Sequence, residues 1–202
     1  MDRVVRHFSR TQPLTWLRSR PGCRNGWRSR ASLDFRLPSV WHPGDDQDWT
    51  RLPQLSLHTP IGDVTVSEED GAVVSIDWGW GRDQTETWLL CRARDQLHAY
   101  FDGELTAFDL PLAPAGTPYR RAVWNALREI PYGQTRSYGD IARAAGGSAR
   151  SVGQANGCNP IPIVIPCHRV VGSGHIGGYS GGEGLLIKRF LLALEGAADD
   201  SG

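Results

Sequence analysis

A cysteine followed directly by a histidine, Cys167-His168, is the pair in this chain best suited to nucleophilic chemistry. A free cysteine has a pKa of about 8.5, whereas one beside a histidine or another positive group is more acidic. Taken alone, an unpaired cysteine is more often a small buried hydrophobe than a nucleophile. The pair stands, however, on a stiff, strand-like stretch from Ile163 to Val171, and this context predicts thiolate chemistry at Cys167.

Prolines precede this pair and glycines follow it. The prolines are Pro160, Pro162 and Pro166, and the glycines are Gly172, Gly174, Gly177, Gly178, Gly181 and Gly182. The prolines remove backbone donors and favour extended backbone before them, so the approach to Cys167 suits neither a helix nor a central strand. The glycines surround Tyr179 and Ser180 and predict a loop that closes over a flat ligand, or simply a flexible turn. Neither the phosphate-binding motif G-x-x-x-x-G-K-[ST] nor a G-x-G-x-x-G motif next to a strand is present here, so a nucleotide cofactor is only weakly indicated.

The residues on either side of Cys167 form a recognisable signature. Pro166-Cys167-His168-Arg169-Val170 is preceded by Asn159-Pro160 and followed by Tyr179-Ser180-Gly181-Gly182. This run closely resembles the methylated-DNA–protein-cysteine methyltransferases, the O6-alkylguanine repair proteins. The similarity extends from about Leu55 to Gly196, including the Tyr100-Phe101-x-Gly103 and Phe108-Asp109-Leu110-Pro111-Leu112 blocks.

The resemblance implies a DNA repair enzyme that moves alkyl groups from O6 of guanine, and from O4 of thymine, irreversibly to Cys167. A lesion inside the base stack is out of reach of a cysteine, so the base must first be flipped out. His168 would take the thiol proton through water, because neighbouring side chains on an extended segment point to opposite faces. Glu195 resembles the carboxylate that orients this histidine, and Arg169 is expected to be structural. The resemblance implies no cofactor and no metal.

The expected DNA-binding residues are Arg136, Tyr138, Arg150 and Ser151. Arg150 matches the family's arginine that enters the stack where the base has left, although an ordinary phosphate contact would also explain it. Tyr138 matches the tyrosine that crowds the target's phosphate. From Arg120 to Arg169 the chain holds seven arginines and two acidic residues, so a phosphate-facing region is expected there although the net charge of the chain is zero.

The expected substrate-binding residues are Asn159, Tyr179 and Ser180. Tyr179 and Ser180 match the family's guanine-binding loop, and Asn159 matches the residue that ties the recognition helix to the active-site segment. Cys158 stands where relatives often have a basic or polar residue. It is interpreted as a lost phosphate contact or as a second, oxidation-prone thiol. Because the thioether product is stable and no second thiol is arranged to regenerate Cys167, we expect one turnover per molecule.

The elements that must position these residues can be read from caps and periodicity. Thr117-Pro118 predicts the start of a helix with Val123, Ala126, Leu127 and Ile130 on one face, ending at 131–133. Ser137 and Asp140 resemble a capping box that opens a short helix ending at Gly146-Gly147, and Ser148 caps a second helix, with Val152 and Ala155 inward, to about Gly157. Two short helices joined by a glycine turn form a helix-turn-helix pattern, which by itself is only suggestive of DNA binding. The last predicted helix uses Leu186, Ile187, Phe190, Leu191 and Leu194.

The region before these helices predicts a small scaffold domain. Leu55 and Leu57, Val64 and Val66, and Val74, Ile76 and Trp78 alternate with polar residues between turns, which predicts an antiparallel meander. A helix that ends at Gly103 is then predicted from apolar residues at helical spacing. These residues are Leu89, Leu90, Ala93, Leu97, Tyr100 and Phe101. With the resemblance, the expected fold class is α/β: a ribonuclease H-like domain, then a mostly helical, winged helix-turn-helix-like DNA-binding domain. The expected boundaries are 55–112 and 113–196.

Residues 1–54 are expected to be a disordered, arginine-rich leader, and 197–202 a tail. The first 36 residues hold nine arginines and two acidic residues, which would also suit a transit peptide, a nucleic-acid arm or a misassigned start codon. No apolar run is long enough for a membrane span, and the four cysteines show no disulfide framework or zinc spacing. The cysteine usage favours a reducing compartment. With the family resemblance we expect a cytoplasmic monomer, nuclear if eukaryotic, whose partner is double-stranded DNA containing O6-alkylguanine.

Two other functions compete with alkyl transfer. One is a non-enzymatic relative that binds the lesion and recruits repair factors, but such proteins lack the cysteine that stands here as Cys167. The other is a helix-turn-helix regulator whose cysteine senses oxidants or alkylation, and it would need an effector or dimerisation region that is not evident. A papain-like protease is disfavoured because only 35 residues follow Cys167.

Overall fold

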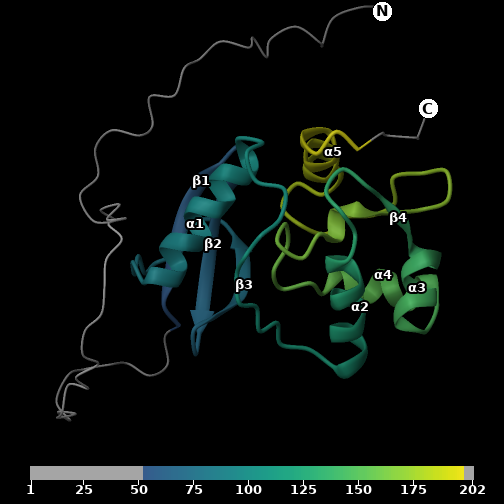
Figure 1. The fold of residues 1–202 in the computed structure, drawn as a ribbon, viewed down its shortest axis with the longest axis horizontal. Helices are drawn as coiled ribbons and strands as arrows, with labels where there is room; N and C mark the ends of the chain where they lie inside the picture. Colours follow the sequence, from purple (N-terminus) through teal and green to yellow (C-terminus); the bar gives the residue numbers. More distant parts are fainter. Residues whose placement is uncertain (1–51, 198–202) are drawn as a thin grey trace, which may run out of the picture. The chain divides into compact units, whose positions relative to one another are not determined.

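A computed structural model describes residues 52–197 of the chain (Figure 1). The predicted leader, 1–54, lies almost wholly outside the described residues, as does all but the first residue of the predicted tail. None of the helices in 52–197 is long and apolar enough to cross a membrane.

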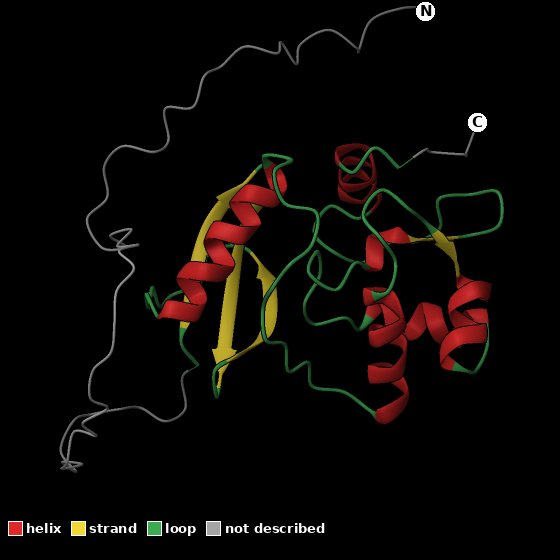
Figure 2. Cartoon of the chain, viewed as in Figure 1, coloured by secondary structure: helices red, strands yellow, loops and turns green. Residues whose placement is uncertain are grey.

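The first elements are three antiparallel strands in the order β1-β2-β3, followed by one helix (Figure 2). Strand β1 spans Gln54–Thr59, β2 spans Gly62–Glu69, β3 spans Ala72–Trp78, and α1 spans Trp88–Phe101. Leu55 pairs with Val66 and Leu57 with Val64, so their side chains share one buried face, against which α1 packs. The predicted meander and helix are confirmed.

A bulge changes which residues of β3 face the core. The β2–β3 register shifts between Ser67 and Glu68, and Val73, not Val74, is fully buried together with Ile76. An inserted residue reverses the alternation of the side chains beyond it, so Val74 does not share a buried face with Ile76, as the predicted regular alternation required. A bulge leaves no clear mark in a sequence of alternating valines.

The free edge of β3 is paired with later parts of the chain. Ile76 donates its backbone N–H to the carbonyl of Pro160 at 2.8 Å, and Val73 donates to the carbonyl of Pro111 at 2.9 Å. The first of these bonds fixes the segment before the cysteine against the sheet. The small domain therefore helps to position the segment that leads to Cys167.

Three helices follow: α2, Pro118–Arg128; α3, Tyr138–Ala145; and α4, Ala149–Gly157. The predicted Thr117 cap and the Ser137–Asp140 capping box are confirmed, and so is the Ser148 cap. Gly146 and Gly147 turn the chain between α3 and α4 with φ of 82° and 93°, which favour glycine. Helix α2 packs against both, and sequence analysis missed its fully buried Trp124, which donates its indole N–H to Ala155 O at 2.9 Å.

The remaining elements are short strands β4, Arg136–Ser137, and β5, Val170–Val171, a 3-10 turn η1, Cys167–Arg169, and helix α5, Leu185–Leu194. Strands β4 and β5 are parallel, which joins the start of α3 to the active-site turn. In α5 the buried face differs from the prediction. Leu186 and Phe190 are 65% and 37% exposed, whereas Lys188 is fully buried.

Candidate active site

Cys167 begins a tight turn and does not lie on the predicted extended stretch. Residues 167–169 form η1, and Cys167 donates its backbone N–H to Ile165 O at 2.8 Å. Just before it, Ile163 has φ of 74°, which is strained for a β-branched residue. The strand-like prediction was wrong around the cysteine, where tertiary packing holds a conformation that local preferences disfavour, and it holds only for Val170–Val171, which form β5. In a 3-10 turn consecutive side chains point about 120° apart, so Cys167 and His168 still diverge.

The thiol of Cys167 is buried, with only 5% of the residue exposed. Burial raises the pKa of the thiol and outweighs the opposing influence of the nearby polar side chains of Asn159 and Tyr179 and of the charge of Lys188. The expected acidic cysteine is therefore not found in the free protein. The resting group is a neutral thiol, and its proton must leave as the reaction proceeds.

His168 follows the cysteine on η1, and its ring contacts a carboxylate. Its Nε2 is 2.8 Å from Glu195 Oε1, and both side chains are completely buried. Burial would raise the pKa of Glu195, but hydrogen bonds from His168 and Arg169 hold it at about 2. Since an ionised carboxylate only accepts, the ring proton must be on Nε2, which leaves Nδ1 as the basic nitrogen. Nδ1 is buried and has no protein partner within the described residues.

Glu195 is the centre of a larger network than sequence analysis predicted. Oε1 accepts from the Tyr100 hydroxyl at 2.7 Å and from Arg169 Nη2 at 2.9 Å, and Oε2 accepts from Arg169 Nε at 2.8 Å and from the Gly133 N–H at 3.3 Å. Arg169 also donates to Ile130 O at 2.6 Å. This buried arginine is thus part of the framework that fixes the carboxylate, in agreement with the expected structural role.

Lys188 was missed by sequence analysis. Its ammonium group is fully buried and donates to Val170 O at 2.5 Å and Gly178 O at 3.2 Å. Burial lowers its pKa to about 8, against the opposing effect of charge on Cys167. The available signal was its spacing, since Lys188 precedes Leu191 by three residues and Leu192 by four and so lies on one face of α5 with them. The buried ammonium can stabilise negative charge that develops on the sulfur.

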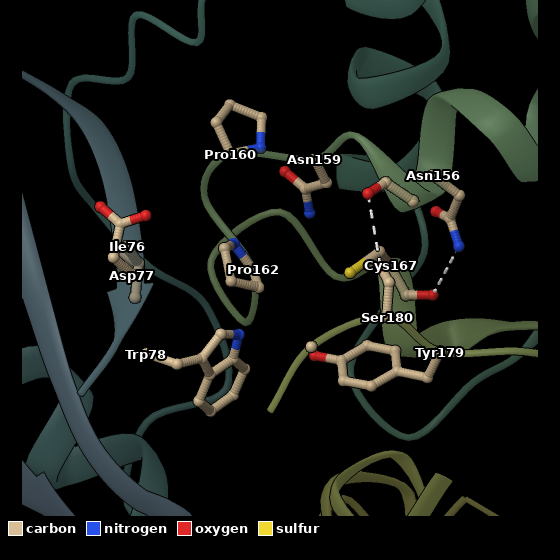
Figure 3. A pocket seen from close by; sticks show the side chains of 12 residues that line it. Ile76, Asp77, Trp78, Asn156, Asn159, Pro160, Pro162, Cys167, Tyr179 and Ser180 are labelled. Carbon is tan, nitrogen blue, oxygen red and sulfur yellow. Dashed lines mark hydrogen bonds between the residues drawn. The ribbon is translucent and has the colours of Figure 1, made fainter. Parts of the chain in front are cut away.

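Cys167 lines a pocket of about 180 Å³ (Figure 3). One wall is strand β3, from Ile76 to Trp78, and the others are the segments that include Asn156–Pro162 and Tyr179–Gly181. The volume is below the roughly 300 Å³ at which drug-sized ligands are usually enclosed. It suits a small ligand.

The structure brings the predicted substrate residues Asn159, Tyr179 and Ser180 together around this pocket. Asn159 donates to Ile165 O at 2.8 Å and fixes the turn before the cysteine, and Ser180 donates to Gly157 O at 3.3 Å. The Tyr179 hydroxyl is buried without a hydrogen-bond partner of accepted geometry in 52–197, and burial and the neighbouring Cys167 keep its pKa raised.

Asn156 lines the pocket and was also missed by sequence analysis. It donates Nδ2 to Cys167 O at 3.2 Å, and its buried Oδ1 has no partner in the described part of the chain (Figure 3). Unpaired buried polar atoms are costly, so they are typical of places where a ligand binds. Asn156 Oδ1 and the Tyr179 hydroxyl offer an acceptor and a donor to such a ligand.

The predicted DNA-binding residues lie at or near the helix-turn-helix. Arg150 is exposed in the first turn of α4, and Arg136 is exposed in β4. Tyr138 begins α3 and is half-buried, with its hydroxyl donating to Gly178 O at 3.4 Å. Ser151 completes the cap of α4 and contacts the Tyr119 hydroxyl at 2.7 Å, so its hydroxyl is already used by the fold.

Comparison with known proteins covers both parts of this arrangement. Residues 55–114 match the family model "6-O-methylguanine DNA methyltransferase, ribonuclease-like domain", and residues 118–197 match "6-O-methylguanine DNA methyltransferase, DNA binding domain". The chain is 45% identical over 152 residues to a methylated-DNA–protein-cysteine methyltransferase of Methanosarcina acetivorans, covering 70% of this chain and 96% of that protein. It is 43% identical over 154 residues to the constitutive enzyme of that name from Bacillus subtilis, covering 69% and 93%.

A solved structure shows the same similarity. The crystal structure of Mycobacterium tuberculosis OGT in complex with DNA is 43% identical to this chain and has a TM-score of 0.65, covering 74% of this chain and 97% of that one. The expected α/β fold, with a ribonuclease-like domain before a helical DNA-binding domain, is confirmed. The chain therefore belongs to the methylated-DNA–protein-cysteine methyltransferase family.

Proposed function

We propose that this protein repairs O6-alkylguanine in duplex DNA by moving the alkyl group to the sulfur of Cys167. One observation carries the proposal: Cys167 lines a pocket into which Asn156 and Tyr179 bring buried polar atoms that lack partners among the described residues, and the next residue, His168, is held by Glu195. A purine has hydrogen-bonding groups along its edges and is flat. Such a ligand fits the size and the chemistry of the site.

The transfer is a displacement at the alkyl carbon. A bond forms from Sγ to this carbon, the bond from the carbon to O6 breaks, and its electron pair goes to the guanine. The thiol proton passes to Nδ1 of His168, through a water molecule, and a proton is returned to the departing guanine, so that thiol and alkylguanine become thioether and guanine. Lys188 stabilises the sulfur while it carries negative charge. The thioether is stable, so each molecule acts once.

The alkylated base must leave the duplex before it can enter the pocket. We infer that α4 faces the DNA, that Arg150 occupies the space left by the base, and that Tyr138 crowds its phosphate. Exposure of Arg150 at the first turn of α4 supports this role, and Arg136 adds positive charge beside α3. We further propose the same transfer from O4 of thymine, a monomeric protein and a cytoplasmic location, or a nuclear one in a eukaryote. Residues 55–112 would serve as the scaffold domain and 113–196 as the domain that carries the chemistry.

The test is a mass measurement after one reaction. Incubation with a duplex containing O6-methylguanine should add one methyl group to the peptide that contains Cys167 and restore guanine in the DNA. Cys167→Ala should lose transfer and keep its preference for the lesion. Cys158→Ala, which changes an exposed cysteine at the end of α4, should react normally. Methyl transfer to a different residue, or an unmodified protein with an intact lesion, would refute the proposal.

A further inference from the structure

Tyr100 reaches the catalytic network from the other domain. It lies in α1, is fully buried, and donates its hydroxyl to Oε1 of Glu195 at 2.7 Å. We propose that Tyr100 is a positioning residue for alkyl transfer: its hydroxyl limits the negative charge that Glu195 presents to His168 and so keeps the imidazole neutral. The inference rests on the proposed function, in which neutral His168 receives the thiol proton.

Packing alone does not require this hydroxyl. The Tyr100 ring lies against other aromatic rings, with centroids 5.4 Å away at Phe101, 5.3 Å at Phe108 and 6.1 Å at Tyr132. A phenylalanine would fill the same space. Burial and the neighbouring charge of Glu195 raise the pKa of Tyr100, so the phenol stays protonated and remains a donor. The hydroxyl is therefore a polar group in an aromatic cluster with one buried acceptor.

The effect on His168 follows from shared use of one oxygen atom. Oε1 of Glu195 accepts from the Tyr100 hydroxyl, from His168 Nε2 at 2.8 Å and from Arg169 Nη2 at 2.9 Å. Donors that share an acceptor each receive less of its charge, since every bond draws on the same lone pairs. Without the Tyr100 hydroxyl, Oε1 would attract the imidazolium form of His168 more strongly.

The other charged and titratable groups around His168 do not replace the effect of the Tyr100 hydroxyl on the charge of Glu195. On η1, Arg169 disfavours a second positive charge, and on α5 Lys188 acts in the same direction. Cys167 adjoins it on η1 and is a neutral thiol at rest. Burial lowers the pKa of His168, and Glu195 is the group that opposes it. The protonation of His168 is consequently sensitive to how many other hydrogen-bond donors Glu195 accepts from.

The test compares Tyr100→Phe with Tyr132→Phe in the full chain. Tyr132 is the matched control, because it packs beside Tyr100 but donates its hydroxyl to Leu194 O at 3.1 Å. The rate of reaction with free O6-benzylguanine, which needs no DNA, is measured against pH. In Tyr100→Phe a larger share of His168 is already protonated, so the acid limb should move to higher pH by about half a unit to one unit. This corresponds to roughly three- to tenfold slower reaction on the limb, with little change on the plateau.

A second variant tests the sign. Replacing Tyr100 by 3,5-difluorotyrosine keeps the hydroxyl and strengthens it as a donor, so the acid limb should move to lower pH. This protein also gives an answer if Tyr100→Phe folds poorly in a thermal melt. An unshifted limb in both variants, or an equal shift in Tyr132→Phe, would overturn the inference. If the unsubstituted protein leaves Cys167 unalkylated, the proposed function fails instead, before Tyr100 is in question.

Discussion

Replacing Glu195 by glutamine tests the buried network as a whole. The amide has almost the same shape as the carboxylate, but it carries no charge and one of its two polar atoms donates instead of accepting. In the native protein both oxygens accept from surrounding donors, which come from Tyr100, His168, Arg169 and Gly133. The glutamine leaves the guanidinium of Arg169 buried without its counter-charge. Its NH2 group also faces at least one of the surrounding donors, so that two donors meet with no acceptor between them.

The cost to stability can be worked out from the pKa of the carboxyl group. The fold lowers the pKa of Glu195 from 4.5 to about 2, and the residue is 5% exposed, so solvent screens the interaction only slightly. Such a shift corresponds to about 3 kcal/mol of stability. Because the folded-state pKa is the lower one, this contribution is complete above about pH 4.5 and is lost as the pH falls through 2. At neutral pH we expect Glu195→Gln to lower the melting temperature by roughly 6–12 °C.

The cost to activity comes from the histidine. A glutamine that turns its NH2 group toward His168 favours the tautomer with the ring proton on Nδ1, and this tautomer cannot accept a proton there. A wrong tautomer of this kind costs on the order of a thousandfold to ten-thousandfold in rate. This loss should appear with free O6-benzylguanine as well as with DNA, because the network takes no part in base flipping.

The assays are single-turnover alkylation rates and thermal melts at pH 7 and at pH 3. Glu129→Gln is the matched control, since Glu129 also caps a helix C-terminus but is exposed. The difference in stability between Glu195→Gln and the unsubstituted protein should shrink at the lower pH. The role assigned to Glu195 would be refuted if Glu195→Gln reacted within tenfold of the rate of the unsubstituted protein and melted at the same temperature as that protein at each pH.

Two further substitutions separate the chemistry from DNA binding. Lys188→Met should slow reaction with free O6-benzylguanine by at least about tenfold, since the pKa of Cys167 rises when the cation is removed; an unchanged thiol titration would contradict this. The unsubstituted protein should also gain stability between about pH 8 and 10.5 in urea melts, because the unfolded lysine binds its proton more tightly there, and the variant should lack this gain. Arg150→Ala should slow repair of duplex DNA at least about tenfold more than reaction with the free base, whereas Arg143→Ala, an exposed arginine paired with Asp140, should slow neither. Equal slowing of both reactions by Arg150→Ala would exclude a role in flipping.

Local signals in the sequence were sufficient for most of the secondary structure. Thr117-Pro118, the Ser137–Asp140 box and Ser148 predict helix starts because each cap is made within a few residues of the same segment. The outcome was different where distant segments meet. The bulge that buries Val73 depends on the register with β2, and the exposure of Leu186 depends on which side of α5 meets the rest of the protein.

The candidate site shows the same division. The residues that carry the family resemblance, Cys167, His168, Tyr179 and Ser180, lie close together in sequence, and the chain alone identified them and the transfer reaction they indicate. The donors around Glu195 could not be found in this way, because Tyr100 and Glu195 are separated by 95 positions and touch only after two domains pack. The sequence by itself identified the proposed nucleophile, the neighbouring histidine proposed as its base, and the helices proposed to present side chains to DNA. Only the tertiary structure decided the protonation of these groups, since burial and contacts between distant residues set the pKa values of Cys167, His168 and Lys188.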